Sequence, residues 1–228
     1  MQNQYNGGAF RYFALENSPL TASASATTAP EQFPGLVALS AALQRSLTVF
    51  DLETTGMARS SGVVELGLLF IKRDGRALQR GTRVNPEMPI APQASKVHGI
   101  YDSDVASCHT LQRYADTLLD MFRRTTVIGF NSRTYDIPVL QANGKRYGIE
   151  LDTPLNIDVR RLWTKFSGSN KGKLVEVAEH YGVEAGQAHA ALGDVLTTAR
   201  ILDKMVQRHS LEKVLELAEL DMPAGATH

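Results

Sequence analysis

The stretch LTVFDLETTG, residues 47–56, constrains the fold more than any other part of the chain. Its apolar residues have the composition of a buried strand, yet Asp51 and Glu53 stand near the carboxyl end of the run. Residues i and i+2 of a strand project from the same face, so we expect the two carboxylates to lie side by side. Two like charges at ~4 Å repel by ~4 kcal/mol at an effective dielectric of 20. A positive group is therefore expected between them.

Length and composition fit one globular domain with appendages. The 228 residues are 43% apolar and 21% charged, and 24 basic residues balance 24 acidic ones. A net charge of zero argues against a basic protein that coats nucleic acid, but it allows an enzyme that grips a few nucleotides. Cys108 is the only cysteine in the sequence, which argues against a disulfide framework or a cysteine zinc cluster. The sequence has no apolar run of membrane length and no secretory signal pattern, so we expect a cytoplasmic protein.

The chain divides into three parts by composition. Residues 1–45 hold few charges and a Ser/Thr/Ala-rich tract, which predicts a flexible low-complexity extension. Within it, an aromatic cluster occupies 9–15, and 36–44 is expected to form a short helix. Residues 46–209 form the predicted folded domain. Residues 210–228 are expected to be a C-terminal helix or tail.

Inside the folded domain, a β-hairpin meander precedes alternating helices and strands. The expected strands are 47–52, 63–72, 77–84, 126–130 and 154–158. The expected helices are a short one ending near 97–100, then 110–124, 136–148, 173–182 and 189–209. This order predicts an α/β fold with a mixed five-stranded sheet flanked by helices.

Two more acids and a histidine stand at the ends of predicted elements. Asp136 follows the fourth strand, and HAALGD puts His189 at the start of the last long helix with Asp194 one turn further on. Binding sites of open α/β sheets gather at the carboxyl ends of strands, so we expect all four carboxylates to converge. Such a set suits Mg²⁺ or Mn²⁺, whereas zinc prefers histidine and cysteine ligands. A rival role for Asp136, compatible with metal contact, is to cap the helix that follows.

Taken in order, FDLETTG, GFNSRTYD and HAALGD resemble the three motifs of the DEDDh 3′-to-5′ exonucleases. That family includes the proofreading subunit of bacterial replicative polymerases, oligoribonuclease and ribonuclease T. The similarity covers residues 46–209 and includes the segment NPEMPIAPQASKVHGI before the second motif. It implies a ribonuclease H-like fold and hydrolysis of phosphodiester bonds from the 3′ end, with release of nucleoside 5′-monophosphates.

The resemblance also implies a role for each motif residue. Asp51, Glu53 and Asp194 surround one cation, and Asp51 is shared with a second cation that Asp136 holds directly or through water. Two ions ~3.5–4 Å apart activate a water and stabilise the leaving 3′ oxygen of an in-line displacement. His189 is then the general base, because the unperturbed pKa of ~6.5 of histidine lies close to working pH.

The turn after the first motif is expected to bind the terminal nucleotide. As in relatives, Thr54, Thr55 and Gly56 would offer backbone amides to it, and Gly56 permits unusual backbone angles. Met57 resembles the apolar residue that some members wedge against terminal bases, with core filler as the alternative. His98 is expected either to border the nucleotide pocket or to be a structural, hydrogen-bonded histidine.

The second motif departs from the family pattern. Asn131 and Asp136 are five residues apart where many members have four, and Phe130 stands where many have histidine. We expect a turn that is one residue longer after the fourth strand. The departure bears on Asn131, a predicted substrate contact, more than on Asp136.

A basic stretch with two aromatic residues follows the fifth predicted strand. Residues 160–173 are expected to form a loop, and such a charge run is more often a solvated loop with Trp163 in the core. The alternative is that its lysines and arginines track phosphates while Trp163 or Phe166 stacks on a base.

The expected substrate is a single-stranded 3′ end, with DNA favoured and RNA possible. A homo-oligomer, a polymerase or a repair protein is a further possible partner. Three other functions stay open: an exoribonuclease, an accessory proofreading subunit, and a catalytically silent binding module. Against the silent module stands the presence of all four acids and the histidine.

Overall fold

A computed structural model of the chain describes residues 27–28, 32–186 and 190–220. Its strands are β1 (Thr27–Thr28), β2 (Ser46–Thr54), β3 (Val63–Ile71), β4 (Arg76–Arg83), β5 (Thr125–Gly129) and β6 (Asn156–Asp158). Its helices are α3 (Pro34–Leu43), α4 (Pro92–His98), α5 (Asp102–Val105), η1 (Leu111–Tyr114), α6 (Ala115–Arg124), α7 (Asp136–Arg146), α8 (Val159–Ser167), α9 (Leu174–His180), α10 (Ala191–His209) and α11 (Leu211–Ala218).

The strands form one mixed sheet in the order β1-β4-β3-β2-β5-β6. β2 pairs antiparallel with β3, and β3 with β4, whereas β2, β5 and β6 run parallel to one another. The five predicted strands are confirmed, and β1 adds a two-residue strand that pairs with β4. Because parallel strands end at the same edge, the residues that follow β2, β5 and β6 are gathered there.

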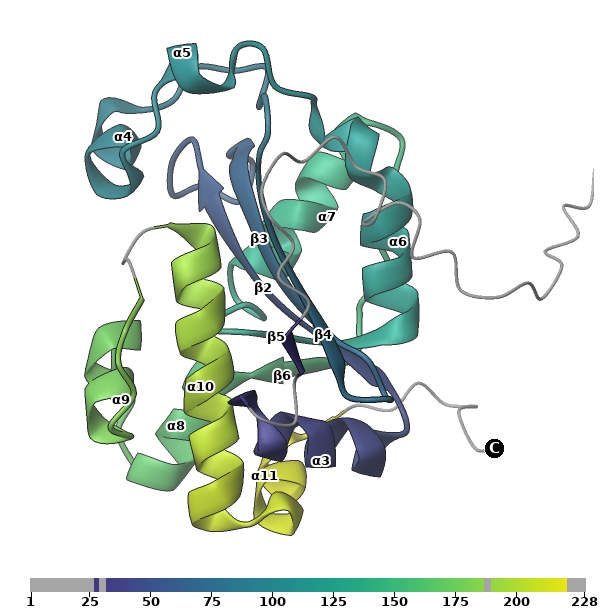
Figure 1. The fold of residues 1–228 in the computed structure, drawn as a ribbon. Helices are drawn as coiled ribbons and strands as arrows, with labels where there is room; N and C mark the ends of the chain where they lie inside the picture. Colours follow the sequence, from purple (N-terminus) through teal and green to yellow (C-terminus); the bar gives the residue numbers. More distant parts are fainter. Residues whose placement is uncertain (1–26, 29–31, 187–189, 221–228) are drawn as a thin grey trace, which may run out of the picture.

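Helices cover both faces of the sheet (Figure 1). Phe50 and Leu52 of β2 pack in one core cluster with α6 and α7, and Leu47 and Val49 pack in a second cluster with α3 and α10. The strand is apolar on both sides because both sides are buried. The same alternation turns Asp51 and the next odd-numbered residue, Glu53, toward the face that α10 covers.

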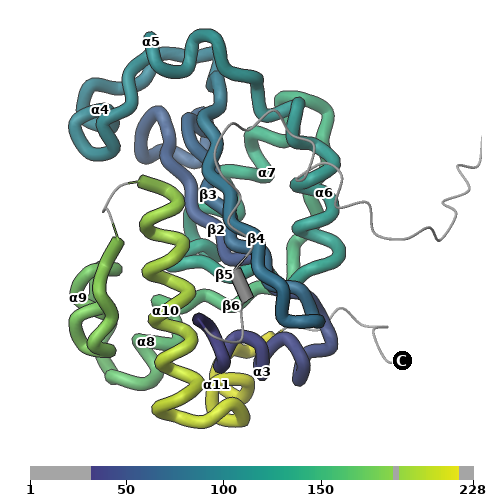
Figure 2. Tube along the Cα trace, in the orientation of Figure 1, coloured from purple at the N-terminus to yellow at the C-terminus, as the bar shows by residue number. Residues whose placement is uncertain are grey.

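Helix α3 belongs to the folded domain. Phe33, Leu36 and Leu39 are 2% exposed or less and lie in the core cluster that includes α10. Although far apart in sequence, α3 and α11 lie together at one end of the molecule (Figure 2). The short helix expected at 36–44 is confirmed. The predicted flexible extension, residues 1–45, wrongly included this helix, whose apolar side chains are buried against α10. The aromatic cluster at 9–15 lies outside the described residues.

The predicted loop 160–173 is wrong for its first half, which is helix α8. The Asp158 carboxylate caps this helix by accepting hydrogen bonds from the backbone N–H groups of Arg160 and Arg161. An acid at the N-cap is a strong helix start signal. Among the described residues, no helix combines the length and the apolar character needed to cross a bilayer.

Candidate active site

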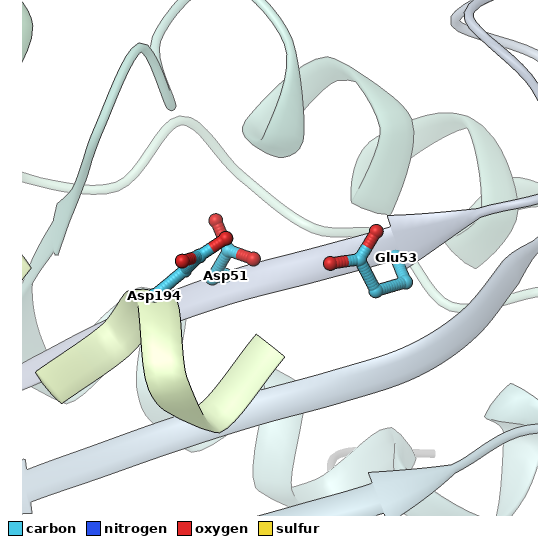
Figure 3. Close-up of side chains that lie close together, drawn as sticks. All are labelled: Asp51, Glu53 and Asp194. Atoms are coloured by element: carbon cyan, nitrogen blue, oxygen red, sulfur yellow. The ribbon is translucent and has the colours of Figure 1, made fainter. Parts of the chain in front are cut away.

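Three carboxylates meet between β2 and the first turn of α10 (Figure 3). Asp51 and Glu53 come from β2 and Asp194 from α10, and one oxygen from each lies within 4.8 Å of the others. Asp194 reaches the pair because α10 begins at Ala191 and covers this face of the sheet. The structure therefore brings the acids of the first and third motifs together.

Burial and mutual repulsion act on these acids. Burial raises the pKa of Asp51 well above its ordinary range, and the charges of Asp136 and Asp194 raise it further. The pKa of Glu53 rises to about 8, first through burial and then through the charge of Asp194. A cation held among the three carboxylates would remove this repulsion. An oxygen-only set suits a hard divalent ion such as Mg²⁺ or Mn²⁺, so the residues fit the predicted metal.

Asp136 lies beside this group of three. It is 5% exposed, and its pKa rises to about 7, first through burial. A hydrogen bond from the backbone of Leu52 acts in the opposite direction and ties the carboxylate to β2. Helix α7 begins at Asp136 itself with Tyr135 at the N-cap position, so the alternative in which Asp136 is the N-cap is wrong.

His189, the predicted general base, lies outside the described residues. It precedes Ala190, which takes the N-cap position of α10 and accepts a hydrogen bond from the N–H of Asp194 at 3.1 Å. The part of His189 in catalysis stays a prediction.

Tyr135 connects the second motif to the turn after the first. Its hydroxyl donates to the carbonyl of Gly56 at 2.7 Å and lies 2.8 Å from the hydroxyl of Thr54. On the other side, Nδ1 of His98 accepts a backbone N–H two residues further on, so Nε2 donates to the carbonyl of Thr54 at 3.2 Å. This supports the alternative of a structural, hydrogen-bonded His98. Sequence reasoning misses Tyr135, although its place next to Asp136 is a signal.

Thr55, Gly56 and Met57, the remaining residues of the predicted nucleotide-binding turn, differ in their hydrogen bonding, backbone conformation and exposure. Thr55 donates its N–H to the carbonyl of Gly62 at 2.8 Å, so the prediction that this amide meets a nucleotide is wrong. Gly56 is not among the glycines with positive φ, so the unusual backbone angles expected there are not found. Met57 is 93% exposed, which overturns the core-filler alternative.

The turn after β5 is organised by Asp158, which sequence reasoning also misses. Its carboxylate accepts the N–H groups of Asn131 and Arg133 at 3.0 and 3.1 Å, besides capping α8. Asn131 has a φ of 65°, in the left-handed region that asparagine tolerates. Its Oδ1 accepts from the guanidinium of Arg160 at 3.1 Å. Asn131 therefore shapes the turn after β5, and its predicted contact with substrate stays a prediction.

The aromatic residues of α8 pack within the protein. Trp163 donates its Nε1–H to the carbonyl of Lys171 at 2.9 Å and lies edge-on to His180, with ring centroids 4.8 Å apart. Phe166 stacks on His209 at 4.0 Å. These contacts favour the core interpretation over base stacking.

The exonuclease sequence model of the RNase T family matches residues 48–202. This range is more than half of the chain and holds all four predicted acids. The chain belongs to this exonuclease family. The resemblance to the DEDDh exonucleases is thereby confirmed, and with it the assignment as a nuclease.

Several curated relatives share this exonuclease domain. The chain is 29% identical over 171 residues to an uncharacterised exonuclease of Escherichia phage 186, covering 69% of the chain and 86% of the relative. It is 26% identical to DNA polymerase III subunit epsilon of Aquifex aeolicus, covering 72% and 82%. It is 25% identical to DNA polymerase III PolC-type of Caldanaerobacter subterraneus subsp. tengcongensis, covering 74% of the chain but only 12% of that protein. The chain thus spans a small part of some relatives and most of others.

Solved structures show the same fold. Exonuclease I of E. coli in complex with a dA16 oligonucleotide superposes with a TM-score of 0.65 at 15% identity, covering 76% of the chain and 42% of that protein. Exonuclease X in complex with 5′ overhanging duplex DNA gives a TM-score of 0.56 at 20% identity, covering 75% and 99%. At these identities the likeness establishes the fold, which confirms the predicted ribonuclease H-like architecture.

Proposed function

We propose that this exonuclease removes nucleotides from single-stranded DNA 3′ ends, with two divalent cations and His189 as the general base, and releases nucleoside 5′-monophosphates. The observation that carries the proposal is the meeting of Asp51, Glu53 and Asp194 in one group, in which the pKa values of Asp51 and Glu53 are raised. A cluster of this kind at the edge of the sheet is suited to hold cations against a phosphodiester.

Each residue group has a distinct part in this proposal. Asp51, Glu53 and Asp194 hold one cation, and Asp136 contributes to a second. Bound divalent cations supply an activated water and stabilise negative charge on the phosphoryl group. His189 accepts the proton of the attacking water, because neutral imidazole is available at working pH. Met57, exposed in the connection between β2 and β3, contacts the terminal base.

The preference for DNA is supported by the relatives and not by the acids alone. Two of the relatives are named DNA polymerase III PolC-type and DNA polymerase III subunit epsilon, and one matching exonuclease I structure is a complex with a dA16 oligonucleotide. The same names support a polymerase as a possible partner of this chain. A cytoplasmic location belongs to the same proposal.

The test is degradation of matched single-stranded DNA and RNA oligonucleotides labelled at the 5′ end, with Mg²⁺, with Mn²⁺ and with chelator. The expected result is a metal-dependent ladder from the 3′ end that is faster on DNA. His189→Ala is expected to slow the reaction by about 10²–10⁴-fold, the usual contribution of a general base. Faster cleavage of RNA would assign the exoribonuclease function instead.

The matched control is Asp120→Asn on α6. Asp120 is about half exposed and pairs with Arg124 one helical turn further on, at 2.9 Å. This change also removes one carboxylate, but from the surface, so activity is expected to match the unchanged protein. Oligonucleotide binding without cleavage under any metal would favour the silent binding module.

A further inference from the structure

Two residues of β3 lie directly opposite the acids of β2. In the antiparallel register, Glu65 faces Glu53 and Gly67 faces Asp51. Residues that face each other across such a pair project to the same side of the sheet. Both residues of β3 therefore point toward the face that α10 covers.

Glu65 supplies a hydrogen-bond acceptor to the start of α10. The N-cap residue there is Ala190, whose own side chain makes no cap bond. The first N–H groups of a helix need acceptors from outside the helix. Glu65 Oε2 accepts the N–H of Ala191 at 2.8 Å, from a strand 126 residues earlier in the chain. The first turn of α10 is thereby bonded to β3, the strand that neighbours the acids of β2.

Gly67 lets the first turn of α10 approach the sheet. A Cβ added at Gly67 would lie 2.5 Å from the carbonyl carbon of Ala191 and 2.8 Å from the nitrogen of Leu192. Gly81 of β4 pairs with Gly67, but a Cβ added there would meet Leu192 at an ordinary 3.6 Å. The helix backbone rests on Gly67, and only a side chain lies over Gly81.

We infer that Glu65 is a positioning residue that, with Gly67, fixes the first turn of α10 on the sheet and so holds Asp194 against Asp51. The inference rests on the proposed function, in which these two acids share a cation. Glu65 sets the lateral position of the helix end through one hydrogen bond, and Gly67 sets its height. Ligand groups of a working site must be held within ~0.5 Å, so a small shift of this turn separates the acids.

A negative charge at Glu65 is a competing explanation for any effect of its removal, because this charge also acts on Asp51 and Glu53. Glu65→Gln separates the two explanations. The glutamine side chain oxygen still accepts the N–H of Ala191, whereas the charge is gone. Glu65→Ala removes both.

The experiment measures Mn²⁺ binding by electron paramagnetic resonance, together with turnover of a single-stranded DNA oligonucleotide at saturating Mn²⁺. Glu65→Ala and Gly67→Ala are expected to weaken Mn²⁺ binding by about 10–100-fold, as loss of a group that orients metal ligands does. Both are expected to lower turnover even at saturating Mn²⁺. Glu65→Gln is expected to keep turnover within about threefold under that condition, because the acceptor remains. Gly81→Ala, the matched control on the neighbouring strand, is expected to behave like the unchanged protein.

Two results would overturn the inference. One is a folded Glu65→Ala protein that binds Mn²⁺ and turns over like the unchanged chain. The other is Glu65→Gln as defective as Glu65→Ala at saturating Mn²⁺, which would assign the effect to charge. If Gly67→Ala fails to fold, the comparison of Glu65→Ala with Glu65→Gln still tests the inference. Failure of the unchanged protein to bind Mn²⁺ or to cut would instead refute the proposed function.

Discussion

The molecule buries acids in two different ways. Asp158 is 5% exposed, and its carboxylate accepts four backbone N–H groups, those of Asn131, Arg133, Arg160 and Arg161, at 3.0 to 3.3 Å. Asp203, 4% exposed, likewise accepts the N–H groups of Gly35 and Leu36 at 2.7 and 3.2 Å and so holds α3 on α10.

In the cluster of Asp51, Glu53 and Asp194, carboxylates face one another. Burial raises the pKa values of Asp51 and Glu53, and the charge of Asp194 raises both further. Burial raises the pKa values of Asp158 and Asp203, and backbone N–H donors oppose this rise. At Asp51 the neighbouring negative charges add to the effect of burial. A buried acid met by N–H groups stabilises the fold. A buried acid that faces other acids marks a place for a cation.

Replacing Asp51 gives the largest expected effect. Asp51→Asn is expected to reduce 3′-end cleavage by about 10³-fold, because cations at such a site supply several kcal/mol of charge stabilisation. The free energy of unfolding measured in chelator is expected to stay the same or rise, since one of several like charges is removed. A large loss of stability in chelator would instead show that Asp51, like Asp158, is an acid that stabilises the fold.

Replacing Asp158 is expected to show the opposite pattern. Asp158→Ala leaves four backbone N–H groups without their acceptor and removes the cap of α8, so the free energy of unfolding should fall by about 3 kcal/mol. Urea unfolding followed by circular dichroism measures this. Asp158→Asn keeps one acceptor oxygen and should lose less. If Asp158→Ala is as stable as the unchanged protein, the comparison between the two kinds of buried acid is broken.

The dependence of stability on pH sharpens the comparison. The folded pKa values of Glu53 and Asp136, about 8 and about 7, lie above the ordinary values of 4.5 and 3.8. The folded protein therefore binds more protons than the unfolded chain between these limits, so its stability in chelator falls as the pH rises from about 4 to about 8. Mg²⁺ should restore more stability at pH 8 than at pH 5, as thermal unfolding in both conditions would show. An equal gain at both pH values would contradict this account.

The smallest expected effect comes from an exposed residue beside the site. Met57→Ala removes a side chain that is 93% exposed, so stability should change by less than about 0.5 kcal/mol. Loss of a uniform contact with the terminal base should raise KM by about fivefold and leave kcat unchanged, as steady-state kinetics on short oligonucleotides would show. Val175→Ala on α9, another exposed apolar residue, is the control. Equal KM values for the two variants would remove Met57 from the substrate site.

Sequence patterns predict most of the elements because the apolar run of β2 and the helical repeat of α10 record burial directly. The boundary of the domain was harder to predict. Helix α3 follows a low-complexity tract, and its first N–H groups are bonded to Asp203, 168 residues away from Gly35. No local pattern reports such a partner. The helix α8 was missed for a related reason, since its cap residue reads equally well as the acidic end of a strand.

The candidate site shows the same division. By itself, the sequence picked out the acids of β2 and α10 that the structure brings together, because ionisable residues in apolar runs require compensation and because the three motifs occur in family order. Only the tertiary structure showed that Asp158, which stands at a strand end as Asp51 does, is a helix cap. Only the tertiary structure placed Glu65 and Gly67 of β3 under the start of α10. The physical reason is that an acid's role depends on what faces it across the sheet, and strand pairing and helix packing decide that over long separations in sequence.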